Sequence, residues 1–186
     1  MRPGAFVLFS LLQTPTTAGK VAVNSLHRLS TTTMSVSDAL SPSAAFFATG
    51  LKAVVGASSD RTKFGNKVLR CYLEKNMAAV PVNKRSKVIE GVECVGSLEL
   101  LKAKVDERAE GVSVPSSMSD VGVSIITGSG VTRMILEEGY SLGVRHFYLQ
   151  PGTYDAEVDY FISTKMPGAS VVKGCVLVEL NYSHRG

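Results

Sequence analysis

Short apolar runs alternate with segments of helical periodicity along most of this chain. The apolar runs predict strands at 52–55, 78–82, 122–126 and 144–149, with an extended piece at 92–95 and an apolar end at 170–180. The periodic segments predict helices over 65–75, 97–104, 131–141 and 155–166. Continuously apolar strands separated by helices are typical of a parallel sheet covered on both faces. The pattern therefore predicts an α/β fold, a Rossmann-like, doubly wound and mainly parallel sheet in a single domain over 44–186.

One internal segment interrupts this alternation. Residues 105–120, VDERAEGVSVPSSMSD, combine charged residues with serine and proline. Such a composition favours an exposed insertion with little regular structure.

The first 43 residues differ in composition from the rest. Residues 1–37 contain no Asp or Glu, and three cations lie there among many Ser and Thr residues. This is how an organelle transit peptide is usually composed, so we expect a transit peptide or disordered leader over 1–43 and a mitochondrial protein. Two alternatives stay open. The apolar stretch AFVLFSLL at 5–12 could belong to a secretory signal, and a start at Met34 would leave a cytoplasmic protein.

Composition narrows the classes of protein to which the chain could belong. An apolar fraction of 45% over 186 residues fits a globular domain, and no apolar run reaches the roughly 18 residues that a membrane span needs. The three cysteines are far apart in the sequence, which favours neither a disulfide framework nor a zinc site. The three cations of residues 1–37 account for most of the net charge of +4. We therefore expect a soluble protein with no metal, nucleic-acid partner or membrane partner.

A glycine-containing turn follows the first strand. Gly56-Ala57-Ser58-Ser59 leads into a helix near Gly65, and the free N–H groups of such a helix start can bind a diphosphate. The dinucleotide pattern G-x-G-x-x-G is absent, because the next glycine is nine residues further on. An ordinary strand-to-helix turn explains the stretch equally well.

Cations follow the second strand, where an NAD-binding domain usually places an acid. The loop PVNKRSK supplies Asn83, Lys84, Arg85 and Lys87. Lysine and arginine suit a phosphorylated ribose, as in coenzyme A or NADP. A solvated basic loop is the alternative.

Several motifs together resemble a known family. VVGASSDRTKFGNKVL, PVNK with IEGVECVGSL, and GVRHFYLQPG with GCVLVE follow one another over about 44–180. In this order they resemble the small stand-alone CoA-binding protein family, which is similar to the CoA-binding domain of the succinyl-CoA synthetase alpha subunit. The family commonly has PVNP and TPP where this chain has PVNK and Thr127-Gly128-Ser129. The loss of two prolines makes these loops more flexible.

The resemblance implies the residues of a CoA site. The diphosphate would contact the turn and the helix entrance, namely Gly56, Ala57, Ser58, Ser59, Lys63, Gly65, Asn66 and Lys67. The adenosine and its 3′-phosphate would contact Val82, Asn83 and Lys84. The rest of the cofactor would contact Thr127, Gly128, Gln150, Pro151 and Gly152.

Catalytic residues are not indicated. His146 lies within a predicted strand without a nucleophile or carboxylate nearby in sequence, which favours a structural histidine. Cys175 follows the last strand and could meet the ligand thiol, although an inert thiol is favoured. We therefore expect binding of coenzyme A or an acyl-CoA without catalysis. A small NADP-dependent oxidoreductase and a ligand-free protein-interaction domain are the alternatives.

Overall fold

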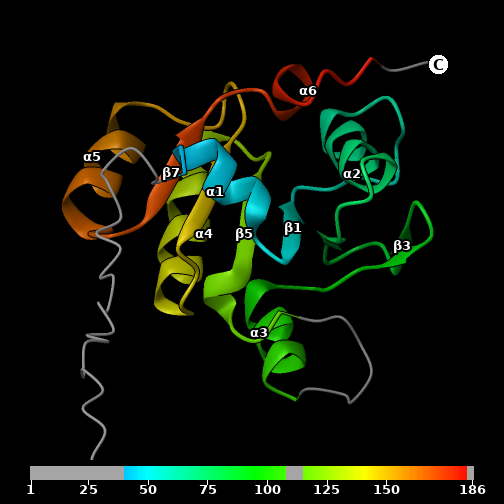
Figure 1. Ribbon diagram of the computed structural model, residues 1–186, viewed down its shortest axis with the longest axis horizontal. Coiled ribbons are helices and arrows are strands. Elements are labelled where there is room, and N and C mark those ends of the chain that lie inside the picture. Colours follow the sequence, from blue (N-terminus) through cyan, green and yellow to red (C-terminus); the bar gives the residue numbers. More distant parts are fainter. Residues whose placement is uncertain (1–39, 108–114, 184–186) are drawn as a thin grey trace, which may run out of the picture. The chain divides into compact units, whose positions relative to one another are not determined.

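Five parallel strands form the central sheet of the computed structural model (Figure 1), which describes residues 40–107 and 115–183. Their order is β2-β1-β5-β6-β7. The bounds are Leu51–Val55 for β1, Ala79–Val82 for β2, Val121–Ile125 for β5, His146–Leu149 for β6 and Ser170–Lys173 for β7. In this register Val55 pairs with both Val82 and Ile125, so the carboxyl ends of the three strands meet at one edge. The predicted parallel sheet is confirmed.

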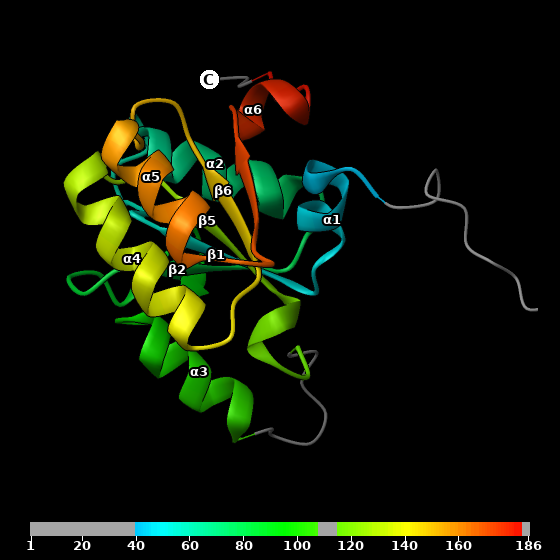
Figure 2. The ribbon, with the colours of Figure 1, turned by 90° about the vertical axis from the view of Figure 1, so that its left-hand side faces the viewer.

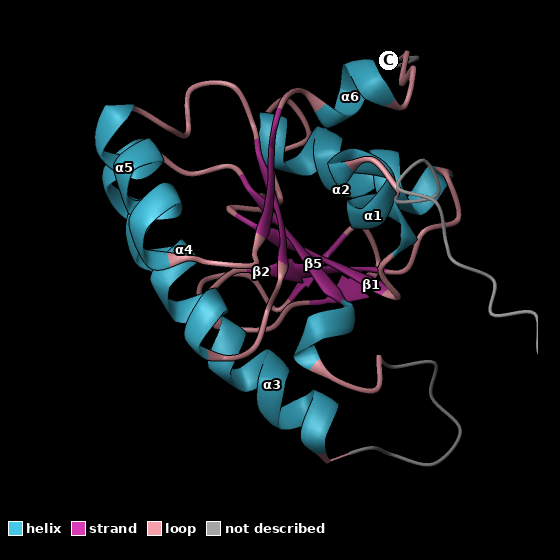
Figure 3. Cartoon of the chain, turned by 60° about the vertical axis from the view of Figure 1, so that its left-hand side comes forward, coloured by secondary structure: helices cyan, strands magenta, loops and turns pink. Residues whose placement is uncertain are grey.

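Helices cover both faces of the sheet, as Figures 2 and 3 show. One layer contains α1 (Pro42–Ala48), α2 (Phe64–Glu74) and α6 (Val176–Glu179). The other contains α3 (Leu98–Asp106), α4 (Ser129–Ser141) and α5 (Ala156–Lys165). This two-sided cover confirms the doubly wound, Rossmann-like fold.

The alternation of side chains along β1 divides the interior into two cores. Ala53 and Val55 pack in the core beneath α3, α4 and α5, whereas Val54 packs beneath α1, α2 and α6. Successive strand residues point to opposite faces, which explains why an unbroken apolar run fills both cores. In the second core the ring of Phe46 meets that of Tyr148 edge-on at 5.2 Å between centroids.

Three short elements were not predicted. They are helix α1, helix α6 and strand β3 (Val88–Ile89), which forms a two-stranded hairpin with β4 (Val92–Glu93), a strand inside the extended piece predicted at 92–95. Glu90 and Gly91 have positive φ angles of 48° and 78°, which is the conformation of a two-residue hairpin turn. The elements escaped detection because each is too short to show a period.

The ends of the predicted segments differ from those of the structure. Helix α1 begins two residues before the domain start predicted at 44, with Ser41 as its cap. The insertion predicted at 105–120 overlaps the last turn of α3 and a 3-10 turn, η2 (Met118–Asp120), whose Met118 is buried. Residues 1–39 and 108–114 lie outside the described residues, and so does most of the predicted leader. Among the described helices, none has the length and apolar character of a membrane span.

Candidate functional site

Two glycines bring the start of α2 against the end of β1. Gly56 has a φ of +91°, and a Cβ there would lie 2.8 Å from the Ile126 carbonyl oxygen. A Cβ on Gly65 would lie 2.1 Å from the Gly56 carbonyl oxygen. Gly56 therefore forms the tight turn and Gly65 permits close helix packing, which are the tasks of the first and third glycines of a dinucleotide-binding turn. The longer loop between them explains why the usual spacing is absent.

Internal hydrogen bonds hold this longer loop. The Asp60 carboxylate accepts hydrogen bonds from the Thr62 backbone N–H and hydroxyl, at 2.9 and 2.7 Å. These bonds, led by the one from the hydroxyl, lower the pKa of Asp60. The Asn83 amide donates to the Ala57 carbonyl oxygen at 2.7 Å. The loop after β2 is thereby tied to the turn after β1.

Asn66 joins α2 to the same loop and to the hairpin. Its side chain is fully buried, and its amide nitrogen donates to the Ser58 carbonyl oxygen and to a Glu90 carboxylate oxygen, at 2.8 and 2.9 Å. Its amide oxygen accepts from Arg70 Nε at 2.9 Å. The predicted ligand contact Asn66 therefore holds the turn in place with its side chain, while Lys63 is exposed at the helix entrance.

Two of the four longest described helices begin without a side-chain cap. Ser97 caps α3 and Asp155 caps α5, but Lys63 and Gly128 occupy the cap positions of α2 and α4 and make no such bond. The two uncapped helices follow β1 and β5, which are neighbours in the sheet. The chain leaves β1 toward β2 and later returns to β5, so the direction of winding reverses here. Ligands of doubly wound folds bind at such a switch point.

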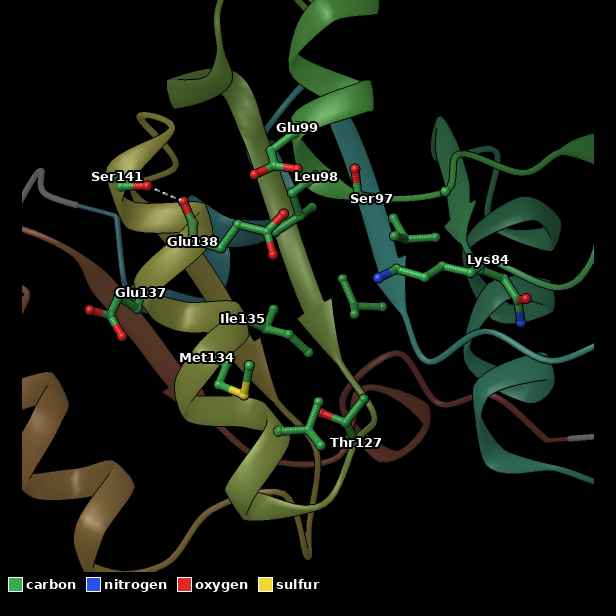
Figure 4. Close-up of a pocket in the computed structure, with 15 residues that line it drawn as sticks. Lys84, Ser97, Leu98, Glu99, Thr127, Met134, Ile135, Glu137, Glu138 and Ser141 are labelled. Atoms are coloured by element: carbon green, nitrogen blue, oxygen red, sulfur yellow. Dashed lines mark hydrogen bonds between the residues drawn. The ribbon is translucent and has the colours of Figure 1, made fainter.

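A pocket of about 660 Å³ opens beside this point (Figure 4). It lies against the ends of β1 and β2 and between α3 and α4. Four predicted residues line it: Val82, Asn83, Lys84 and Thr127. The lining residues that the sequence analysis missed are Val55, Gly96, Ser97, Leu98, Glu99, Val131, Met134, Ile135, Glu137, Glu138 and Ser141. Such a volume is typical of pockets for small molecules.

Charges of opposite sign line different parts of the pocket. Lys84 extends its ammonium group into the pocket from the β2 side (Figure 4). Glu99, Glu137 and Glu138 come from α3 and α4. Exposed apolar side chains also line α4, because Val131 and Met134 are 52% and 65% exposed. The arrangement suits an anionic group near Lys84 and a flat apolar group along α4.

The remaining predicted residues lie around the same sheet edge. Gln150 is 1% exposed, and its side-chain oxygen accepts a hydrogen bond from the Val176 N–H at 3.1 Å. That contact places the side chain in the α1, α2 and α6 layer, on the face opposite the pocket. Pro151 and Gly152 are exposed after β6. Ser59 is exposed and Lys67 half-buried near the start of α2.

Three titratable groups that could carry chemistry, His146, Cys71 and Cys175, do not line the pocket. His146 begins β6 and thus lies at the opposite end of the strand, where burial lowers its pKa. Burial raises the pKa of the Cys71 thiol to about 11. Cys175 is a half-buried free thiol at the start of α6. In the described part of the chain no group of three His, Cys, Asp or Glu side chains could hold a metal ion.

Comparison with known families agrees with this geometry. Residues 52–181 match the family described as CoA binding domain, and the match extends over well more than half of the chain. The chain belongs to the CoA-binding domain family. This places the switch point and its pocket within a CoA-binding domain and confirms the resemblance noted in the sequence. A comparison with curated proteins gives no match.

Solved structures share the fold. A conserved hypothetical protein from Pyrococcus furiosus is 25% identical, with a TM-score of 0.54, over 70% of this chain and 98% of that protein. A protein from Thermus thermophilus is 22% identical, with a TM-score of 0.57, over 76% and 98% of the two chains. A hypothetical protein from Pyrococcus horikoshii is 18% identical, with a TM-score of 0.57, over 76% and 90%. The CoA-binding domain of this chain therefore has the architecture of these small proteins.

Proposed function

We propose that this protein binds coenzyme A or an acyl-CoA and carries out no reaction on it. The diphosphate lies at the Gly56 turn, between the uncapped starts of α2 and α4. The adenosine enters the pocket beside α4, with its 3′-phosphate at Lys84. The acyl or thiol end extends toward Pro151 and Gly152.

The observation that carries this proposal is the pair of uncapped helices at the switch point. Helix starts without a capping side chain offer backbone N–H groups and partial positive charge to an anion. Lys84 adds a full positive charge inside the adjoining pocket. Among the described residues, Lys84 has no carboxylate within ion-pair distance. The two helix starts and Lys84 therefore supply positive potential that supports binding of the CoA phosphates.

The absence of catalysis is proposed from the groups that line the site. His146 lies at the far end of its strand, and Tyr72 and Tyr148 are buried in the opposite core. The carboxylates of the pocket lie along α3 and α4 without a histidine, cysteine or tyrosine among the lining residues. A general acid or base has to lie within reach of the reacting atoms. In the proposed pose the thiol or thioester end lies toward Pro151 and Gly152, so the carboxylates along α3 and α4 face the adenosine and not the reactive end.

Calorimetric titration of the full chain with CoA, dephospho-CoA, acetyl-CoA, NADP and NAD tests the proposal. We expect CoA to bind and dephospho-CoA to bind at least about tenfold more weakly, because a charge-assisted contact to the 3′-phosphate is lost. Binding of NADP without CoA would favour the oxidoreductase. If none of the five ligands binds, the alternative of a ligand-free protein-interaction domain is favoured.

We also propose that the protein is mitochondrial, on the composition of its first 43 residues. Fusion of residues 1–43 to a fluorescent protein should direct it to mitochondria. Replacing Arg2, Lys20 and Arg28 by glutamine should abolish that import. A cytoplasmic signal from the unaltered fusion would support a start at Met34 instead.

A further inference from the structure

Glu138 has a buried acceptor without a donor. Its Oε1 atom is inaccessible to solvent and has no hydrogen-bond partner in the described part of the chain. The residue lines the pocket, and its side chain extends from α4 toward the pocket interior (Figure 4). A buried carboxylate oxygen without a hydrogen bond is costly, because it has lost water and gained nothing in exchange.

The position of Glu138 in α4 adds to this cost. It lies in the last turn of the helix, where the backbone carbonyls give a partial negative charge. No basic residue occupies that turn. The Ser141 hydroxyl donates to the Glu138 backbone carbonyl at 2.8 Å and not to its carboxylate. Among the described residues, neither a hydrogen-bond donor to Oε1 nor a basic residue of this helix turn compensates that oxygen.

The other two carboxylates of the pocket differ from Glu138. Glu99 lies in the first turn of α3, where the positive end of the helix stabilises it. Glu137 is exposed and points away from the pocket interior (Figure 4). Glu138 is therefore the carboxylate for which a ligand has to provide the donor.

We propose that the Glu138 carboxylate accepts a hydrogen bond from the exocyclic amine of adenine and thereby selects adenine over other purines. This inference rests on the proposed CoA binding. With the 3′-phosphate at Lys84, the base extends along the exposed apolar side chains of α4, Val131 and Met134. Adenine presents an N–H donor at its C6 position, whereas hypoxanthine and guanine present a carbonyl oxygen there. A carboxylate attracts the first and repels the second.

Adenosine 3′,5′-bisphosphate and inosine 3′,5′-bisphosphate test this directly, because they differ only at the base. Titration of the full chain should give at least about tenfold tighter binding of the adenine compound, as expected for a hydrogen bond to a charged group. In Glu138→Gln this preference should fall toward one, since the amide can either accept from the amine or donate to the carbonyl. The control variant Glu107→Gln should keep the preference of the original chain, because Glu107 is exposed at the end of α3 and does not line the pocket.

Titration with CoA itself distinguishes a failure of the role of Glu138 from a failure of the proposed CoA binding. If CoA binds and the two bisphosphates bind equally to the original chain, the role of Glu138 is overturned while CoA binding stands. The same holds if Glu138→Gln retains the full preference. If CoA and both bisphosphates fail to bind, the proposed function is wrong and this inference fails with it. A Tm of unliganded Glu138→Gln that is no lower than that of the original chain would exclude a folding defect.

Discussion

The buried polar groups of the two helical layers differ in their hydrogen bonding. In the layer of α1, α2 and α6, the Tyr72 hydroxyl bonds Ser124 at 3.2 Å, the Tyr148 hydroxyl bonds Glu179, and Asn66 bonds three partners. In the layer of α3, α4 and α5, a pocket remains open and the Oε1 atom of Glu138 has no partner. The buried polar groups named for the first layer are paired within the chain, whereas His146 Nδ1, on the same strand face as Tyr148, has no partner among the described residues. The second contains the space and the free acceptor that a ligand can fill.

This difference shows how a structural polar residue can be told from a ligand-binding one. Burial alone does not separate them, since Asn66 and Gln150 are more buried than Glu138. The state of the hydrogen bonds does, because buried polar groups are normally paired. An unpaired acceptor inside a pocket of a known CoA-binding domain is therefore the more informative signal.

The largest effect on stability is expected at Gly65, where α2 packs against the turn after β1. Gly65→Ala places a methyl group against the Gly56 carbonyl and should lower the free energy of unfolding by about 3 kcal/mol. Gly130→Ala in α4 is the control, because nothing lies within 4 Å of a Cβ at that position. It should raise the free energy of unfolding by about 0.5 kcal/mol. Urea denaturation measures both, and equal effects would contradict the close packing at Gly65.

Removing a polar side chain from each layer should change stability in opposite directions. Asn66→Ala leaves the Glu90 carboxylate and the Ser58 carbonyl without their donor and should cost about 2 kcal/mol. Glu138→Gln removes a charge from the negative end of α4 and should stabilise the unliganded protein by about 0.5 kcal/mol. Thermal unfolding without ligand is the measurement. Destabilisation by Glu138→Gln would mean that its carboxylate has a structural partner after all.

Reversing the charge of Lys84 should weaken the binding of CoA more than it lowers the stability of the fold. Lys84→Glu places a negative charge in the pocket and should raise the Kd for CoA at least about tenfold, with a smaller rise for dephospho-CoA. Lys87→Glu is the matched control, since Lys87 is exposed in the same loop and does not line the pocket. If Lys84→Glu raised the Kd for CoA and for dephospho-CoA equally, the placement of the 3′-phosphate at Lys84 would be wrong.

The smallest effect is expected from the pH dependence of His146. Burial lowers its pKa in the folded chain, so the unfolded chain binds the proton more readily. Stability is then greatest above the unfolded pKa of about 6.5 and falls as the pH drops through the lower folded value. His146→Gln should show a smaller loss of Tm between about pH 7 and pH 5 than the original chain. An identical loss would assign the pH dependence to other groups.

The main elements of the fold could be predicted because their signals are local. Each long helix has an apolar stripe and each central strand is mainly apolar, so the order of elements and the parallel sheet follow. Helices α1 and α6 and strand β3 are too short for such a signal. Their places depend on contacts far away in the sequence, such as that of Phe46 with Tyr148.

The site was predictable only where it lies directly after a strand. Lys84 and Thr127 follow β2 and β5, and the rule that ligands bind beyond strand ends places them at the pocket. Glu99, Met134 and Glu138 lie within helices, and which helical face meets the pocket depends on how the helices pack. The exposed apolar pair Val131 and Met134, three residues apart, is the one sequence signal that could have indicated this face.

The pairing of β1 with β5 sets the order in which this protein can assemble. Leu51 pairs with Val121, so a long stretch of chain has to be closed before the two strands meet. Contacts between such distant residues form slowly, because the entropy of loop closure comes before any gain from packing. During synthesis, β1, α2 and β2 emerge well before β5. The pocket between α3 and α4 therefore forms late in folding, and a nascent chain that ends before Val121 has the Gly56 turn but no pocket beside it.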